Sequence, residues 1–337
     1  MVRLSRPGLA LLLLLGGCVA HLMPAGPDTA PPALEAEAIR TADGQTLPLR
    51  HWAPAGPPRA AILALHGMND YSNAFDQPGR ALAAQGIVTY AYDQRGFGRG
   101  PHPGLWSDRA TLAADARTAL RLLAERHPGL PLFLLGESMG GAVAIEALAP
   151  APPFAPPPAG VRGAILVAPA VWGRDSMGAF QRALLWLAEA LTPGLTLTGR
   201  GLDILPSDNI EMLRALSRDP LVIKETRVDA IHGLVDLMDA AEADVTRLPL
   251  PLLLLYGEKD EVIPPEPVWQ AIAALDRPDQ RAALYPEGWH MLLRDLQAQR
   301  VIDDIAAWTA DPAAPLPSGA DRHAGAVLAE RRAERSR

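Results

Sequence analysis

The sequence predicts an α/β fold with a mostly parallel, doubly wound sheet and a helical cap inserted before the penultimate strand. Two observations support this prediction. Short apolar runs alternate along the chain with amphipathic or alanine-rich segments, which is the pattern of strands joined by crossover helices. Between residues 169 and 251 the alternation stops and the pattern becomes helical, which indicates an insertion over the carboxyl edge of the sheet.

The first half of the chain predicts a hairpin, two buried strands and two helices. The hairpin turns at Asp43-Gly44, a strong turn signal between two strand-like runs. The next two runs are largely apolar, as expected for strands buried on both faces. The longer helix is amphipathic and stops at the Pro-Gly pair 128–129. The predicted strands are 37–40, 46–52, 60–65 and 87–92, and the predicted helices are 74–85 and 109–126.

The second half continues the alternation around the helical insertion. Residues 150–160 are nearly all proline and alanine and predict a surface loop. The predicted strands are 132–135, 161–167, 252–256 and 282–285, and the predicted helices are 141–148, 265–275 and 292–309.

The N-terminus has the pattern of a targeting segment. Arg3 and Arg6 precede an apolar core at 9–15, which is much too short to span a bilayer. Residues 15–18 read Leu-Gly-Gly-Cys and resemble the lipobox of bacterial lipoproteins; Cys18 is the only cysteine. The resemblance implies lipidation of Cys18 and a lipid-anchored place in the bacterial cell envelope, and Val19 favours outer-membrane sorting. An ordinary signal peptide is the alternative.

Composition and charge predict how the chain is divided into segments. The net charge of −7 implies no basic face, so nucleic acid is not an expected partner. The charged C-terminal end is expected to be a mobile tail, with a helix over 324–335 as the alternative. The predicted segments are a signal peptide at 1–17, a flexible tether at 18–35, the main domain at 36–310 with its cap at about 170–250, and the tail at 311–337.

The pentapeptide Gly-Glu-Ser-Met-Gly at 136–140 stands between a predicted strand and a predicted helix. This context makes it a nucleophile elbow, a turn so sharp that only glycine fits two positions either side of Ser138. The turn places the serine hydroxyl at a helix N-terminus, where negative charge is favoured. Ser138 is therefore the predicted nucleophile.

A serine hydroxyl needs a base and a carboxylate that orients the base. Asp260 and His290 each lie in a loop just past a predicted strand, in the order serine, acid, histidine. Glu258 and Glu261 are the alternative acids. Two backbone N–H donors are expected for the oxyanion, one from Met139 and one from Met68 in the loop after residues 60–65.

Taken together, five motifs resemble the monoacylglycerol lipase and lysophospholipase branch of the α/β-hydrolases. The resemblance covers residues 36–309 and includes the Asp-Pro-Leu segment 219–221 of the cap. It implies Ser138, Asp260 and His290 as catalytic residues. The motifs are Leu-His-Gly-Met at 65–68, Asp-Gln-Arg-Gly-Phe-Gly at 93–98, Gly-Glu-Ser-Met-Gly-Gly at 136–141, Gly-Glu-Lys-Asp at 257–260 and Gly-Trp-His at 288–290.

The expected activity is therefore hydrolysis of lipid esters, such as monoacylglycerols or lysophospholipids, through an acyl-enzyme and without a metal or cofactor. The apolar start of the cap, with Trp172, Phe180, Trp186 and Leu187, is expected either to pack on the body or to line an acyl tunnel. An amidase or peptidase, a cofactor-free haloperoxidase and a non-catalytic envelope lipoprotein are the alternatives. The oligomeric state is left open.

Overall fold

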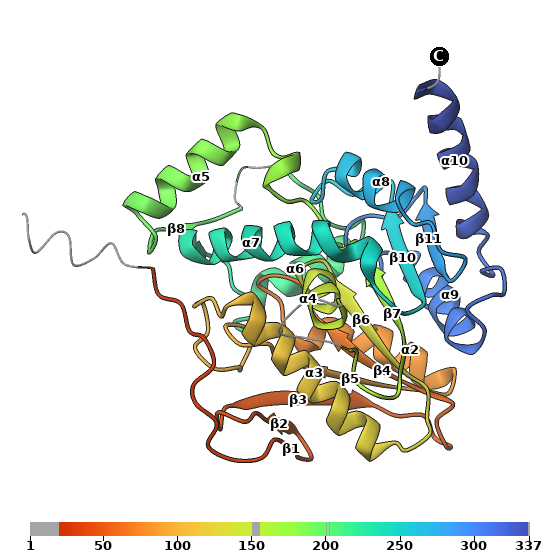
Figure 1. Ribbon diagram of the computed structural model, residues 1–337, viewed down its shortest axis with the longest axis horizontal. Coiled ribbons are helices and arrows are strands. Elements are labelled where there is room, and N and C mark those ends of the chain that lie inside the picture. Colours follow the sequence, from red (N-terminus) through yellow and green to blue (C-terminus); the bar gives the residue numbers. More distant parts are fainter. Residues whose placement is uncertain (1–19, 150–155, 200, 202, 336–337) are drawn as a thin grey trace, which may run out of the picture.

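The structure, a computed structural model, describes residues 20–149, 156–199, 201 and 203–335. Within these residues nine strands form one sheet in the order β1-β2-β3-β5-β4-β6-β7-β10-β11 (Figure 1). Strands β1 to β3 pair antiparallel, as do β3 and β5, and all pairs from β5 to β11 are parallel. The strands are β1 Ala33–Leu34, β2 Ala38–Arg40, β3 Thr46–Trp52, β4 Ala60–Leu65, β5 Ile87–Tyr92, β6 Leu132–Glu137, β7 Val161–Val167, β10 Leu252–Gly257 and β11 Gln280–Tyr285.

Helices cover both faces of the sheet, which confirms the doubly wound prediction. Strand β4 shows why: its alternate side chains enter two different apolar clusters, with Leu63 on one face and Ile62 on the other. Helices α3, α4, α7 and α8 contribute to the Leu63 cluster, and α2 and α9 to the other. The helices are α2 Asp76–Ala84, α3 Arg109–Arg126, α4 Met139–Leu148, α5 Ala179–Leu191, α6 Ile210–Arg218, α7 Val228–Asp244, α8 Pro265–Ala273, α9 Ala298–Ala310 and α10 Ala320–Arg335, with short 3-10 helices at Ser72–Phe75, Arg174–Ser176 and Val245–Arg247.

The cap lies between β7 and β10, before the penultimate strand, as predicted. It contains α5, α6, α7 and a two-stranded ribbon of β8 Thr196–Leu197 and β9 Thr226–Arg227. Helix α7 packs directly on α4 and so belongs to the helical layer of the body, whereas α5 stands outside α7, away from the sheet (Figure 1).

Three segments differ from the sequence predictions. The helix predicted over 292–309 begins only at Ala298, because residues 291–297 form a series of turns, in which Arg294 and Asp295 lie. The predicted mobile tail contains α10, the alternative left open. This helix covers the edge strand β11, to which the Arg281–Asp321 ion pair (3.2 Å) joins it, and it also contacts α8, where the Arg331 guanidinium lies 4.1 Å from the centroid of the Trp269 ring. Residues 20–35, the expected flexible tether, follow a hydrogen-bonded path over the body.

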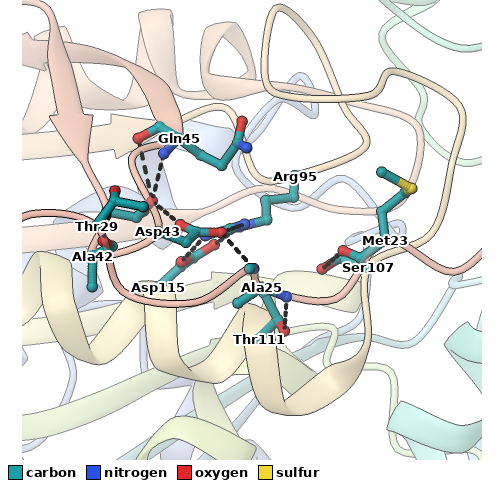
Figure 2. A network of polar contacts seen from close by, with 12 residues as sticks. Met23, Ala25, Thr29, Ala42, Asp43, Gln45, Arg95, Ser107, Thr111 and Asp115 are labelled. Carbon is teal, nitrogen blue, oxygen red and sulfur yellow. Dashed lines mark hydrogen bonds and ion pairs between the residues drawn. The ribbon is translucent and has the colours of Figure 1, made fainter.

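A buried ion cluster joins the β2–β3 turn to α3. Arg95 donates hydrogen bonds to both carboxylate oxygens of Asp43 (2.6 and 2.9 Å) and of Asp115 (2.6 and 3.0 Å), as Figure 2 shows. Hydrogen bonds from Arg95 hold the pKa of Asp43 well below its usual range. Burial raises the pKa of the Asp115 carboxyl to about 6, although the same arginine acts to lower it. The guanidinium thus acts to lower the pKa of both carboxyls, but at Asp115 the effect of burial is larger.

Asp115→Asn tests this cluster through the pH dependence of stability. Because the pKa of Asp115 is raised from 3.8 to about 6, the native state holds this proton more tightly than the unfolded chain. The contribution of Asp115 to the free energy of unfolding therefore falls as pH rises through this interval. We expect Asp115→Asn to gain on the order of 3 kcal/mol relative to wild type between about pH 4 and pH 7, measured by urea unfolding.

Asp43→Asn provides the control of opposite sign. The lowered pKa of Asp43 means that its contribution is present above the unfolded pKa and is lost as pH falls. The deficit of Asp43→Asn relative to wild type should therefore shrink in acid. A stability difference for Asp115→Asn that does not change with pH would contradict the assigned shift.

Candidate active site

Ser138 lies at the turn between β6 and α4 in a strained backbone conformation, with φ 55° and ψ −118°. Such a conformation is uncommon for a residue with a side chain and persists where its surroundings enforce it. The two glycines explain how the turn closes. A Cβ on Gly136 would lie 2.2 Å from the Gly140 carbonyl oxygen, and a Cβ on Gly140 would lie 2.1 Å from that of Leu65. The predicted elbow geometry is therefore present.

The loop after β4 lies beside this turn. A Cβ on Gly67 would lie 3.3 Å from the Cβ of Ser138, so the absence of a side chain at Gly67 lets the loop approach the hydroxyl. Met68 follows in this loop, and Met139 is the first residue of α4, where backbone N–H groups have no acceptor within the helix. The two predicted oxyanion donors thus come from segments that meet at Ser138; their role stays a prediction.

His290 and Asp260 meet, although 30 residues separate them in the chain. Nδ1 of His290 lies 2.8 Å from Oδ2 of Asp260, and both side chains are buried. The other oxygen of Asp260 accepts hydrogen bonds from the backbone N–H groups of Val262 (2.7 Å) and Ile263 (3.0 Å). With Nδ1 donating to the carboxylate, Nε2 is left as the acceptor that a general base requires.

No hydrogen bond joins Nε2 of His290 to Oγ of Ser138 within the described part of the chain. Such bonds are often long in unliganded enzymes and tighten when substrate binds. The three residues lie past the ends of β6, β10 and β11, which run parallel and therefore end at the same edge of the sheet.

The alternative acids have other partners. Oε2 of Glu258 pairs with Nε2 of His323 on α10 at 2.9 Å. Oε2 of Glu261 accepts a hydrogen bond from the backbone N–H of Leu205 in the cap, at 2.7 Å. Neither glutamate is bonded to His290, so the geometry favours Asp260 among the three candidates.

His66 is fully buried and both of its ring nitrogens are engaged. Nδ1 donates to the carbonyl of Gly67 (2.9 Å), and Nε2 accepts from the backbone N–H of Gln94 (3.0 Å). Burial lowers the pKa of the imidazole, so it stays neutral and cross-links the loop after β4 to the 93–98 turn. The Asp-Gln-Arg-Gly-Phe-Gly motif at 93–98 therefore has a structural role: its Gln94 binds His66, and its Arg95 belongs to the buried ion cluster.

A second buried ion network lies beneath the elbow, and the sequence analysis does not predict it. Arg294 donates to Asp70 in the loop after β4 (2.7 Å) and to Glu137, the residue before Ser138 (3.0 Å). Burial alone would lower the pKa of Arg294, but attraction to Glu137 and Asp70 outweighs it and raises the pKa. The cation thus connects the loop after β4, the elbow and the loop that carries His290. The only sequence signal is a charged residue at position 137, inside the elbow.

We expect Arg294→Met to destabilise the protein by about 3–5 kcal/mol, because it leaves two buried carboxylates without a counter-ion. Urea unfolding measures the loss. Adding Asp70→Asn and Glu137→Gln to Arg294→Met should restore part of it. Arg80→Met is the matched control: Arg80 also pairs with an aspartate, Asp76, but on the surface, and the unfolding midpoint should change little. Equal effects of the two arginine substitutions would contradict the network's role.

The cap is bonded to the site loops on two sides. On one side, Ser207 donates to Asp295 (2.6 Å), and the Met291 N–H donates to the Pro206 carbonyl (3.0 Å). On the other side, the Tyr71 hydroxyl donates to Asp219 (2.7 Å), the first residue of the Asp-Pro-Leu segment. Part of the cap is therefore a fixed wall of the site.

No group of three or more potential metal-ligating His, Cys, Asp or Glu side chains is found among the described residues.

Two roles were expected for the cap's apolar residues, packing on the body or lining an acyl tunnel, and most of the four residues show neither. Trp172 packs on the core of the body, which is the first of these roles. Phe180, Trp186 and Leu187 of α5 instead face solvent, so they neither pack on the body nor line a closed tunnel.

Comparisons with known proteins agree with this geometry. A monoacylglycerol lipase of Mycolicibacterium smegmatis is 27% identical over 269 residues, covering 76% of this chain and 90% of the relative. The human monoglyceride lipase is 27% identical over 272 residues, covering 79% and 88%. The crystal structure of a Paleococcus ferrophilus monoacylglycerol lipase superimposes with a TM-score of 0.63 at 25% identity, covering 79% of this chain and 99% of that one.

The family model described as serine aminopeptidase, S33, matches residues 56–297, which is more than half of the chain and includes Ser138, Asp260 and His290. The predicted resemblance and fold are confirmed: the chain belongs to this serine aminopeptidase S33 family and has the α/β-hydrolase fold.

Proposed function

We propose that the protein is a serine ester hydrolase that cleaves lipid esters such as monoacylglycerols or lysophospholipids. The observation that carries the proposal is the pairing of a strained elbow serine, Ser138, with an Asp260–His290 hydrogen bond at the same edge of the sheet. The relatives from M. smegmatis and human, whose names state monoacylglycerol or monoglyceride hydrolysis, are matched over 90% and 88% of their length.

The geometry supports an acyl-enzyme mechanism. Oγ of Ser138 attacks the ester carbonyl carbon while Nε2 of His290 takes the hydroxyl proton, and Asp260 stabilises the imidazolium. The backbone N–H groups of Met68 and Met139 donate to the oxyanion. Collapse of the tetrahedral intermediate breaks the bond to the alcohol, which leaves with the proton from His290. Water then attacks the acyl-enzyme, giving its proton to His290, and the fatty acid and free Ser138 result.

A substrate panel tests the proposal. Purified protein should hydrolyse monoacylglycerols, lysophospholipids and p-nitrophenyl esters. The family's description as aminopeptidases makes amino-acid p-nitroanilides the informative comparison, because the same three residues can cleave amides. Faster cleavage of the anilides than of every ester would assign the protein to peptide or amide hydrolysis instead.

We also propose that Cys18 is lipidated and anchors the enzyme in the bacterial envelope, in the outer membrane. The support is the Leu-Gly-Gly-Cys pattern with its only cysteine; the signal peptide and Cys18 lie outside the described residues. No helix in the described part of the chain has the length and hydropathy needed to cross a bilayer. A lipoprotein anchor carries more than one acyl chain, and membrane attachment by two or more chains is firm.

Mass spectrometry of the mature N-terminus tests the anchor. We expect a peptide that begins at Cys18 and carries diacylglycerol, and we expect Cys18→Ser to leave the precursor uncleaved. An unmodified N-terminus at another residue would make the protein an ordinary secreted hydrolase.

A further inference from the structure

The loop after β4 makes a tight turn at Met68 and Asn69. The N–H of Asp70 donates to the carbonyl of Gly67 (3.3 Å), which closes a four-residue turn with Met68 and Asn69 at its centre. Asn69 has a φ of 66°, in the left-handed region, whereas the φ of Met68 is not positive. A positive φ at the third position alone is the pattern of a type II turn, which favours glycine or asparagine there. Asn69 therefore sets the backbone geometry of this turn.

The turn carries the N–H of Met68, which is a predicted oxyanion donor. No acceptor in the described part of the chain is bonded to this N–H. The turn lies beside the nucleophile, since a Cβ on Gly67 would lie 3.3 Å from the Cβ of Ser138. Because the peptide unit between Gly67 and Met68 is planar, the direction of the N–H follows from the geometry of the turn. An oxyanion donor needs such a fixed direction and no competing acceptor.

Asn69 joins this turn to the cap by two hydrogen bonds. Its backbone carbonyl accepts from the Ile223 N–H (2.9 Å), and its side-chain Nδ2 donates to the hydroxyl of Thr226 in the β8–β9 ribbon (2.7 Å). Met68 and Ile223 also pack on the same apolar core cluster, and they line one cavity of only about 10 Å³. The turn and the cap segment 223–226 are therefore in direct contact.

Stability alone does not explain an asparagine at this position. The Oδ1 of Asn69 is buried and has no hydrogen-bond partner among residues 20–149, 156–199, 201 and 203–335. An unmade hydrogen bond at a buried acceptor costs stability. Glycine adopts the same left-handed backbone without strain and would bury no amide. What asparagine adds over glycine is the bond of its side chain to Thr226.

We propose that Asn69 is a positioning residue for the hydrolysis: it sets the turn that presents the Met68 N–H, and it locks this turn to the cap. The inference rests on the proposed serine hydrolase function and deepens it, because it gives the cap a part in the chemistry. The position of the cap segment 223–226 is transmitted to the oxyanion site through one side chain. When that bond is lost, the Met68 N–H is misdirected, and the rate falls although the fold is kept.

Asn69→Gly separates this role from a structural one. Glycine keeps the left-handed backbone and removes the buried amide, so the urea unfolding midpoint should stay close to that of wild type. The kcat for p-nitrophenyl butyrate should fall by roughly 10 to 100-fold with little change in KM, because a misdirected donor stabilises the transition state less. An unchanged kcat would overturn the proposal, as would a rise in KM without a fall in kcat.

Thr226→Val tests the same bond from the side of the cap. Valine has nearly the shape of threonine but no hydroxyl, so Nδ2 of Asn69 loses its acceptor and kcat should fall. Thr226→Ser keeps the hydroxyl and should retain the wild-type kcat. Thr192→Val is the matched control, since Thr192 is an exposed cap threonine whose hydroxyl donates to the Ala188 carbonyl; its kcat should be that of wild type. Wild-type turnover by Thr226→Val would refute the lock to the cap.

The double variant Asn69→Gly/Thr226→Val decides whether the two residues act through one bond. Each single substitution removes the same side-chain hydrogen bond. The double variant should therefore be no slower than the slower of the two single variants. Reductions in kcat that multiply would mean that the residues act separately, which contradicts the proposal.

An inhibitor that forms an oxyanion gives a readout that a merely structural role would not move. When a trifluoromethyl ketone with a butyl chain binds, Oγ of Ser138 bonds to the ketone carbon, the π electrons move to the carbonyl oxygen, and the hydroxyl proton passes to His290. The new oxyanion lies where the Met68 N–H donates. The affinity for the ketone should fall in Asn69→Gly and Thr226→Val by the same factor as kcat/KM. Unchanged affinity would overturn the proposal.

Failure of the proposed function and failure of this inference give different results. Wild-type protein that hydrolyses no ester would refute the esterase function. The ratio of ketone affinities between wild type and Asn69→Gly would still test the inference, because amide hydrolysis uses the same oxyanion donors. Ester hydrolysis by wild type and Asn69→Gly at equal rates would refute the inference alone.

Discussion

Replacing Ser138 by alanine should reduce ester hydrolysis by roughly 10⁴ to 10⁶-fold while leaving the fold intact. The substitution removes only the hydroxyl group. The Cβ that alanine retains keeps the same backbone preferences, and the glycines that close the turn are unchanged. The residual rate would come from the oxyanion donors and substrate binding alone. Turnover of p-nitrophenyl butyrate, together with the urea unfolding midpoint, measures both parts of the expectation.

Ser217→Ala is the matched control, because Ser217 is an exposed cap serine whose hydroxyl donates to the Arg214 carbonyl. It should hydrolyse esters at the wild-type rate. A fluorophosphonate probe should label wild type and Ser217→Ala but not Ser138→Ala. Near wild-type hydrolysis by Ser138→Ala would rule out the mechanism, and failure of the probe to label wild type would favour a non-catalytic binding protein.

Asp260→Asn should reduce turnover by roughly 10⁴-fold, through the tautomer of His290. Oδ1 of Asp260 accepts two backbone N–H groups, so the amide oxygen of asparagine must occupy that position. Its NH₂ group would then face Nδ1 of His290 and donate to it. The ring proton is thereby moved to Nε2, which can no longer accept the proton of Ser138.

Glu258→Gln and Glu261→Gln are the controls, since both glutamates bond elsewhere: to His323 and to the Leu205 N–H. Their turnover should fall far less than that of Asp260→Asn. The pH profile adds a second readout, because the wild-type dependence on a basic Nε2 should be lost in Asp260→Asn. If either glutamine variant is the more impaired, the acid is misassigned.

The strands and the order of the predicted site residues could be read from the sequence because their signals are local. The runs at 60–65, 87–92 and 161–167 appear in the structure with the predicted bounds, since a strand buried on both faces needs a continuous apolar run. The elbow could also be predicted from the sequence, because Gly136 and Gly140 are required by contacts within a few residues of Ser138 or with the adjacent strand.

The buried ion networks could not be predicted from the sequence, because the residues that form them are distant in the chain. Arg294 meets Asp70 across 224 residues and Glu137 across 157. In the sequence, each of these residues looks like an ordinary charged residue of a surface loop. Among the three candidate acids, all within residues 258–261, only the direction of each side chain separated Asp260 from its neighbours.

The sequence by itself thus determined the sheet, the sharp serine turn and the chain order of the predicted triad, since periodicity and glycine placement act over a few residues. Only the tertiary structure decided what the apolar face of α5 meets. A helix with residues 180, 184, 187 and 191 apolar has the same pattern whether that face packs on a core or points outward. The course of residues 20–30 was likewise decided by partners at 106–111 and 229, whose polar groups bind the backbone of this segment.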